Sequence, residues 1–185
     1  DDYYDPSEDD TDYFKSTTRK RNIKRKDLIS TVPLSLFNYA IESNGDQKFI
    51  FFYRIFEFFW NKAKLLKLKE MRYNNNVSEK KIAEILDIRN EIKSLQMLLS
   101  EAISEKKKNK LSSYAKFNKM IKKNNFENLV DELYKFRNSI IHAKEEQLSK
   151  TNIPNPFLPN QEIIKWIYIA EELSLECIKK YNIRE

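Results

Sequence analysis

Apolar residues recur at three- and four-residue steps along most of the chain after residue 30, which is the spacing of one face of an α-helix. A short helix is predicted to begin at Pro33, a residue tolerated in a first helical turn, and to end near Asn44-Gly45. The next run, from about Gln47 to Tyr73, is apolar almost all round in its first half. Such a helix lies at the centre of its domain or at an interface. Its aromatic residues are therefore expected in the core rather than as platforms for stacked bases.

The second half of the chain continues the helical pattern. Ser78 has the side chain of an N-cap, and the helix it starts is expected to run to about Glu105. Residues 106–110 are predicted to form a basic turn, followed by a shorter amphipathic piece that reaches Ile121. The pattern thus predicts an all-α bundle of about five to six helices.

Two further helices are expected near the end of the chain. One begins near Phe126 and the other spans about Gln161 to Tyr181. Between them, residues 151–160 contain three prolines, which forbid a continuous helix and predict a loop.

Composition agrees with a helical chain that stays out of membranes. One Gly and five Pro are too few for the turns of a β-rich fold. A single cysteine, Cys177, excludes an internal disulfide and fits the reducing cytoplasm, with packing as its expected role. No membrane span is expected, because even the aromatic run 49–60 contains Arg54 and Glu57.

Charge divides the chain into a tail and a domain. Seven acids lie within residues 1–12 and seven bases within 15–26, so these two blocks cancel and the rest of the chain carries the net +6. Residues 1–30 are expected to be a charged, disordered linker or tail, and residues 31–185 to form the helical domain. Because the chain opens with Asp1 and not with Met, we expect a fragment of a longer protein.

His142 is the only histidine, and this restricts the available chemistry. A zinc site built on several His and Cys ligands has no ligand set, and one glycine cannot form a phosphate-cradling loop. We therefore expect neither a metal nor a cofactor. Any hydrolase that needs an imidazole must use this one.

Two polar residues of interest, Arg137 and Asn138, precede His142 on the helix that begins near Phe126. At about 100° per residue, Asn138 and His142 share one helix face, whereas Arg137 lies about 140° around from His142. An imidazole that moves protons and a guanidinium that binds phosphate suffice for metal-independent RNA cleavage. The alternative is that Arg137 is a surface ion-pairing residue and His142 a capped, half-buried residue at the helix end.

The segment Arg137-Asn138-x-x-x-His142, late in an all-helical domain, resembles the signature of the HEPN superfamily. The aromatic run 52–59 also resembles a helix of HEPN branches linked to phage defence. The resemblance implies a homodimer with both motifs facing one cleft, and a metal-independent endoribonuclease in its active members.

The resemblance also implies a role for each matching residue. Arg137 would bind the scissile phosphate, His142 would do acid/base or orienting work, and Asn138 would position the substrate or the imidazole. Glu57 would pair with Arg137 or with Arg54; in the second case the pair has no catalytic meaning. The extra length suggests an effector domain that follows a sensor domain in a larger protein.

These predictions leave three hypotheses for the function. The first is a toxin or antiphage effector that cleaves RNA in the cytoplasm. The second is a non-catalytic HEPN-like module for dimerisation, partner binding or nucleotide binding. The third is a helical interaction domain unrelated to this superfamily, which the motif disfavours.

Overall fold

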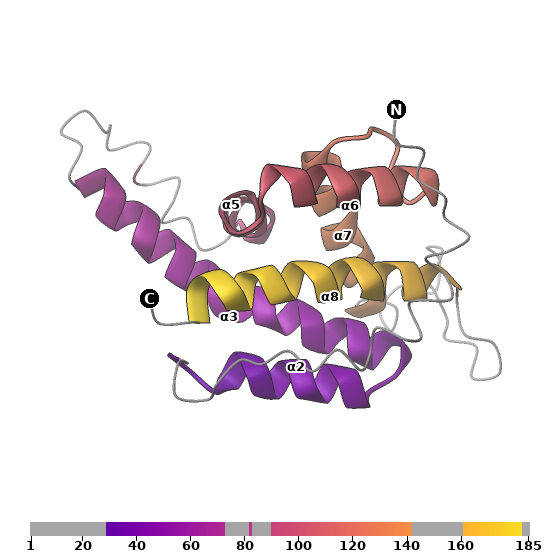
Figure 1. The fold of residues 1–185 in the computed structure, drawn as a ribbon, viewed down its shortest axis with the longest axis horizontal. Helices are drawn as coiled ribbons and strands as arrows, with labels where there is room; N and C mark the ends of the chain where they lie inside the picture. Colours follow the sequence, from indigo (N-terminus) through magenta and orange to yellow (C-terminus); the bar gives the residue numbers. More distant parts are fainter. Residues whose placement is uncertain (1–28, 73–81, 83–89, 142–160, 183–185) are drawn as a thin grey trace.

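The computed structural model describes residues 29–72, 82, 90–141 and 161–182. Within these ranges all regular secondary structure is helical, which confirms the predicted all-α class (Figure 1). The six helices are α2 (Val32–Glu42), α3 (Gly45–Arg72), α5 (Glu91–Ala102), α6 (Glu105–Phe117), α7 (Phe126–Ile141) and α8 (Gln161–Asn182). Ser78, the loop 151–160 and the tail up to residue 28 lie outside the described residues.

The aromatic helix α3 is central, as its all-round apolar pattern predicts. It packs against α2, α5, α7 and α8, and α8 runs along it in Figure 1. Most of the large residues in its first half are at most 1% exposed: Phe49, Phe52, Tyr53, Ile55, Phe56 and Phe59. Phe58 is an exception, at 39% exposed. The expectation that these aromatics form the core is confirmed.

The predicted basic turn at 106–110 is wrong, because these residues form the first turns of α6. The chain breaks earlier, at Ile103, which has an extended backbone and is only 3% exposed. Lysine is a good helix former, and Leu111 and Ala115 provide a buried face that packs the helix onto the bundle. Burial of these apolar residues therefore decides where the turn falls.

Helix α6 ends at Phe117, earlier than the predicted amphipathic piece that reaches Ile121. The Met120 amide donates to the Ala115 carbonyl at 2.9 Å and the Lys119 amide to the Lys116 carbonyl at 3.1 Å. This pair of bonds is a Schellman motif, which places Lys119 in the left-handed region, with φ of 58°. Glycine adopts this conformation more easily than lysine does.

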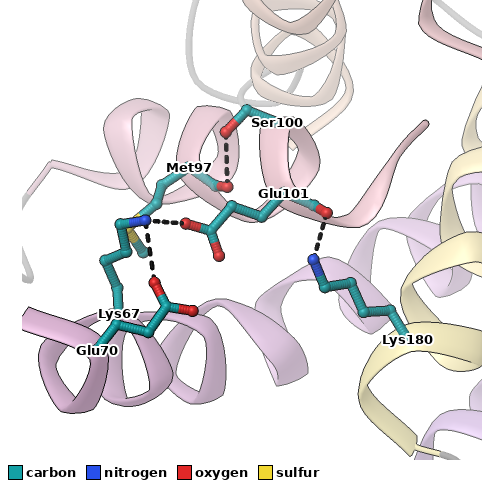
Figure 2. Close-up of polar contacts among 6 residues, drawn as sticks. All are labelled: Lys67, Glu70, Met97, Ser100, Glu101 and Lys180. Atoms are coloured by element: carbon teal, nitrogen blue, oxygen red, sulfur yellow. Dashed lines mark hydrogen bonds and ion pairs between the residues drawn. The ribbon is translucent and has the colours of Figure 1, made fainter. Parts of the chain in front are cut away.

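Polar contacts tie the end of α5 to α3 and α8 (Figure 2). Lys67 on α3 contacts Glu70 at 3.2 Å and Glu101 on α5 at 3.1 Å. The Lys180 ammonium on α8 donates to the Glu101 carbonyl. One residue of α5 thus joins two other helices.

The last residue of α8 holds the chain segment that precedes α2. The Asn182 carbonyl accepts from the Ile29 amide at 2.8 Å, and its side-chain amide donates to the Ser30 carbonyl at 2.8 Å. Cys177 is completely buried, as its predicted packing role requires. No helix in the described ranges is long and apolar enough to cross a membrane.

Candidate functional site

Helix α7 carries the candidate motif, and its buried face fixes the direction of Arg137. Leu129, Val130, Leu133 and Phe136 are buried along this helix. Phe136 meets the Phe49 ring edge-on, with ring centroids 5.1 Å apart, and stacks on Trp166 with centroids 5.3 Å apart. Phe136 is thus anchored against α3 and α8, and the side chain of the next residue, Arg137, is directed towards polar groups of α3 and α5.

Arg137 is held by a carboxylate from a neighbouring helix, α3. Its Nη2 donates to Oε1 of Glu57 on α3 at 3.0 Å. The side chains are 16% and 32% exposed, so water only partly screens this ion pair. Glu57 therefore pairs with Arg137, one of the two partners that the sequence allowed.

The second terminal nitrogen of Arg137 has two acceptors nearby. Nη1 donates to Oδ1 of the adjacent Asn138 at 3.0 Å and lies 3.8 Å from Oε2 of Glu91. That Glu91 oxygen also accepts from the Tyr134 hydroxyl at 3.3 Å. Glu91 lies in the first turn of α5, behind the N-cap Asn90. Three helices, α3, α5 and α7, thus contribute to what we call the Arg137 cluster (Tyr53, Glu57, Glu91, Tyr134, Arg137 and Asn138).

The Tyr53 ring lies beneath the guanidinium, whose carbon is 5.4 Å from the ring centroid, a cation–π distance. Tyr53 is 1% exposed, and its hydroxyl has no hydrogen-bond partner in the described part of the chain; the same holds for Nε of Arg137. Burial raises the pKa of the Tyr53 hydroxyl well above its ordinary value, although the charge of Arg137 lowers it. Tyr53 therefore stays neutral and supports the guanidinium with its ring.

Replacing Tyr53 by phenylalanine is expected to reduce the loss of stability in alkali. The pKa of Tyr53 is raised in the folded chain, so above about pH 10 the hydroxyl ionises readily only in the unfolded chain. The contribution of Tyr53 to the free energy of unfolding is therefore intact below about pH 10 and is lost as the pH rises above it. The variant should therefore lose stability less steeply, by up to about 1.4 kcal/mol per pH unit. Urea unfolding at pH 7, 10 and 11 measures this difference.

Tyr39→Phe is the matched control, because Tyr39 is 56% exposed. That variant should follow the native chain at every pH. If Tyr53→Phe also lost stability as steeply as the native chain above pH 10, the burial argument for Tyr53 would be wrong.

The structure brings together three of the five predicted site residues. Arg137, Asn138 and Glu57 lie in the Arg137 cluster, whereas Arg54 is exposed and its guanidinium carbon lies 6.0 Å from the Phe51 ring centroid. His142 lies outside the described residues; it follows Ile141, the last residue of α7, in the sequence.

Sequence reasoning missed Tyr53, Glu91 and Tyr134. A signal for Glu91 was available: Asn90 followed by an acid is a typical helix start, and the Asn90 side chain accepts from the Lys93 amide at 3.1 Å. Nothing in the sequence distinguishes Tyr53 from the other aromatic residues around it.

The charged groups of the Arg137 cluster are two carboxylates and one guanidinium. Two carboxylates face one guanidinium, so the cluster has a formal charge of −1 when all three are ionised. In the described ranges no three His, Cys, Asp or Glu residues gather closely enough to hold a metal. The arrangement fixes Arg137 in place and leaves a small part of its side chain open to solvent.

No protein-family model matches the chain, and no curated protein or solved structure matches it. The Arg137 cluster and the sequence at the end of α7 are therefore the features of this chain that point to a function.

Proposed function

We propose that this chain is a HEPN-type, metal-independent endoribonuclease that acts as a toxin or antiphage effector. The observation that carries the proposal is the Arg137 cluster. Its guanidinium is held at 3.0 Å by Glu57, the Arg137 side chain is 16% exposed, and Arg137 lies five positions before His142 in the sequence. An arginine that binds phosphate and a histidine that moves protons are a typical pair for phosphate chemistry.

The proposed reaction is internal attack within the RNA. The 2′-oxygen bonds to the adjacent phosphorus, and its proton passes to a neutral imidazole of His142. The bond from phosphorus to the 5′-oxygen then breaks, and that oxygen takes a proton from an imidazolium. Arg137 donates to the phosphate oxygens, where negative charge builds up as the new bond forms.

Glu57 and Asn138 favour this role because they fix Arg137 before the substrate binds. An oriented guanidinium loses less side-chain entropy when it binds a phosphate than a free one does. Glu91 is the weaker carboxylate contact, at 3.8 Å from Nη1, so a phosphate oxygen is expected to replace it there. Glu57 would keep its hydrogen bond throughout.

We propose a homodimer because the resemblance to the HEPN superfamily implies one, and the single histidine of each chain agrees with it. The reaction needs one group to accept a proton and another to donate one, and each chain has a single imidazole. A two-fold dimer whose Arg137 clusters face one cleft would supply two imidazoles to one phosphate. The proposed active site is therefore shared between two copies.

Expression of the native chain and of His142→Ala in a bacterium tests the proposal. We expect the native chain to arrest growth and to fragment total RNA, and the variant to do neither, because general acid/base catalysis contributes about 100- to 10,000-fold. Arg54→Ala, outside the Arg137 cluster, is the matched control and should remain toxic. The purified native chain should cut RNA in EDTA.

A second candidate is a non-catalytic helical module for dimerisation or for partner or nucleotide binding. The observation that favours it is that Glu57 and Glu91 already neutralise Arg137, as in a purely structural cross-link between helices. It predicts equal growth and intact RNA for the native chain and His142→Ala. That result would replace the nuclease proposal.

A further inference from the structure

The strongest concentration of charge in the described chain lies on α6 and the segment that follows it. Residues 105–123 contain eight lysines and a single acid, Glu105, so this stretch has a formal charge of +7. The whole chain carries +6. Because the opposed blocks within residues 1–26 cancel, this stretch accounts for the net positive charge of the rest of the chain.

Six of these lysines are exposed: Lys106, Lys110, Lys116, Lys119, Lys122 and Lys123. Among the described residues none of the six has a carboxylate partner, whereas Lys107 and Lys108 are paired with Glu172 and Glu105. Phe117 lies within the set and is 61% exposed. We call these six lysines and Phe117 the α6 basic surface.

The fold directs this surface outward. The buried positions of α6 include Leu111 and Ala115, so the apolar side of the helix is occupied by the bundle, and α6 lies along its upper edge in Figure 1. The Schellman motif then holds Lys119 at a positive φ, where glycine would be less strained. A lysine at this position keeps a charge beside Phe117.

We propose that the α6 basic surface binds single-stranded RNA, with lysines on the phosphates and Phe117 stacked on a base. An exposed aromatic residue among unpaired cations is the typical composition of a single-strand binding surface. The inference rests on the proposed function for its choice of RNA and adds a second contact region outside the Arg137 cluster.

The two regions lie at opposite ends of α7. The Lys123 amide donates to Oδ1 of Asn128 at 2.9 Å, which fixes the basic segment against the first turns of α7. Arg137 is 11 residues after Phe126, about 16 Å along the helix axis. A strand of a few nucleotides is long enough to reach from one region to the other, so this surface would hold RNA near the cleavage site.

Fluorescence anisotropy with a labelled 20-nucleotide uridine-rich RNA tests the inference, on the full chain carrying His142→Ala so that no RNA is cut. The surface variant combines Lys110→Gln, Lys119→Gln and Lys122→Gln. The control combines Lys69→Gln, Lys93→Gln and Lys179→Gln, which are exposed lysines of α3, α5 and α8 and remove the same charge. Circular dichroism confirms that both variants fold.

Each phosphate contact contributes about 0.7 to the slope of log affinity against log salt. The surface variant should therefore lose about 2 from this slope and bind about 100-fold more weakly at 0.1 M salt. The control variant should bind like the parent. Phe117→Ala should bind about 5- to 150-fold more weakly with an unchanged slope, because a stacked base is lost and no charge is removed.

Equal losses in the two triple variants would overturn the inference, because only total charge would then matter. Binding to phosphatidylglycerol vesicles that needs the same lysines, without RNA binding, would also overturn it in favour of a membrane surface. If the native chain cuts RNA but both triple variants bind RNA equally well, the inference about the α6 basic surface fails and the nuclease proposal stands. If the chain binds RNA through the α6 basic surface but cuts none, the nuclease proposal fails and the inference about the surface stands.

Discussion

Replacing Arg137 by lysine is expected to reduce RNA cleavage about 100- to 1,000-fold, the usual effect of removing one oriented donor to a developing charge. Lysine keeps the positive charge, but its single nitrogen cannot reach Glu57, Glu91 and Asn138 in the geometry that the guanidinium uses. The phosphate would lose an oriented pair of donors. Steady-state cleavage of a labelled RNA by the purified variant measures the effect.

The same Arg137→Lys substitution should have only a small effect on the free energy of unfolding. Breaking a fully buried ion pair removes about 3–5 kcal/mol, but Glu57 and Glu91 are 32% and 40% exposed and a lysine would still face them. The loss in unfolding free energy should therefore be about 0.2–1 kcal/mol, the value typical of exposed ion pairs. A large fall in unfolding free energy with unchanged cleavage would instead assign Arg137 a purely structural role.

Phe136→Ala is expected to lower the free energy of unfolding by about 3–5 kcal/mol, which is a large part of the stability of a domain. Phe136 is 7% exposed and joins α7 to Phe49 of α3 and to Trp166 of α8. Alanine would leave a cavity where these three helices meet. Urea unfolding followed by circular dichroism measures the loss.

Phe117→Ala is the matched control for this variant, because the same side chain is removed from a site that is 61% exposed. Its unfolding free energy should change by at most about 0.5 kcal/mol. If the two variants lost equal stability, Phe136 would not be the link between helices described above.

The helices with the strongest apolar period could be predicted closely from the sequence. The last helix was expected over about Gln161 to Tyr181 and spans Gln161–Asn182. The division between α5 and α6 could not be predicted in this way. The local residues around Ile103 are compatible with a helix, and the break is set by tertiary burial of Ile103 and of the apolar face of α6 that follows it.

The partner of Glu57 shows the same limit at the candidate site. Arg54 is three residues away, a spacing that favours an ion pair within a helix, whereas Arg137 is 80 residues away. The local spacing did not determine the partner, because α3 turns Arg54 towards solvent and Glu57 towards α7. The motif itself could be found from the sequence, but the carboxylates that hold its arginine depend on how three helices pack.

The contact between Ser30 and Asn182 has a consequence for how this bundle can be connected to other polypeptides. Residues that are 152 positions apart lie within hydrogen-bonding distance, so the first and last segments of the described bundle meet at one corner. A domain whose two ends adjoin can be grafted into a surface loop of a host protein without separating the flanks of that loop. A short linker across the same corner should likewise allow a circularly permuted chain to fold.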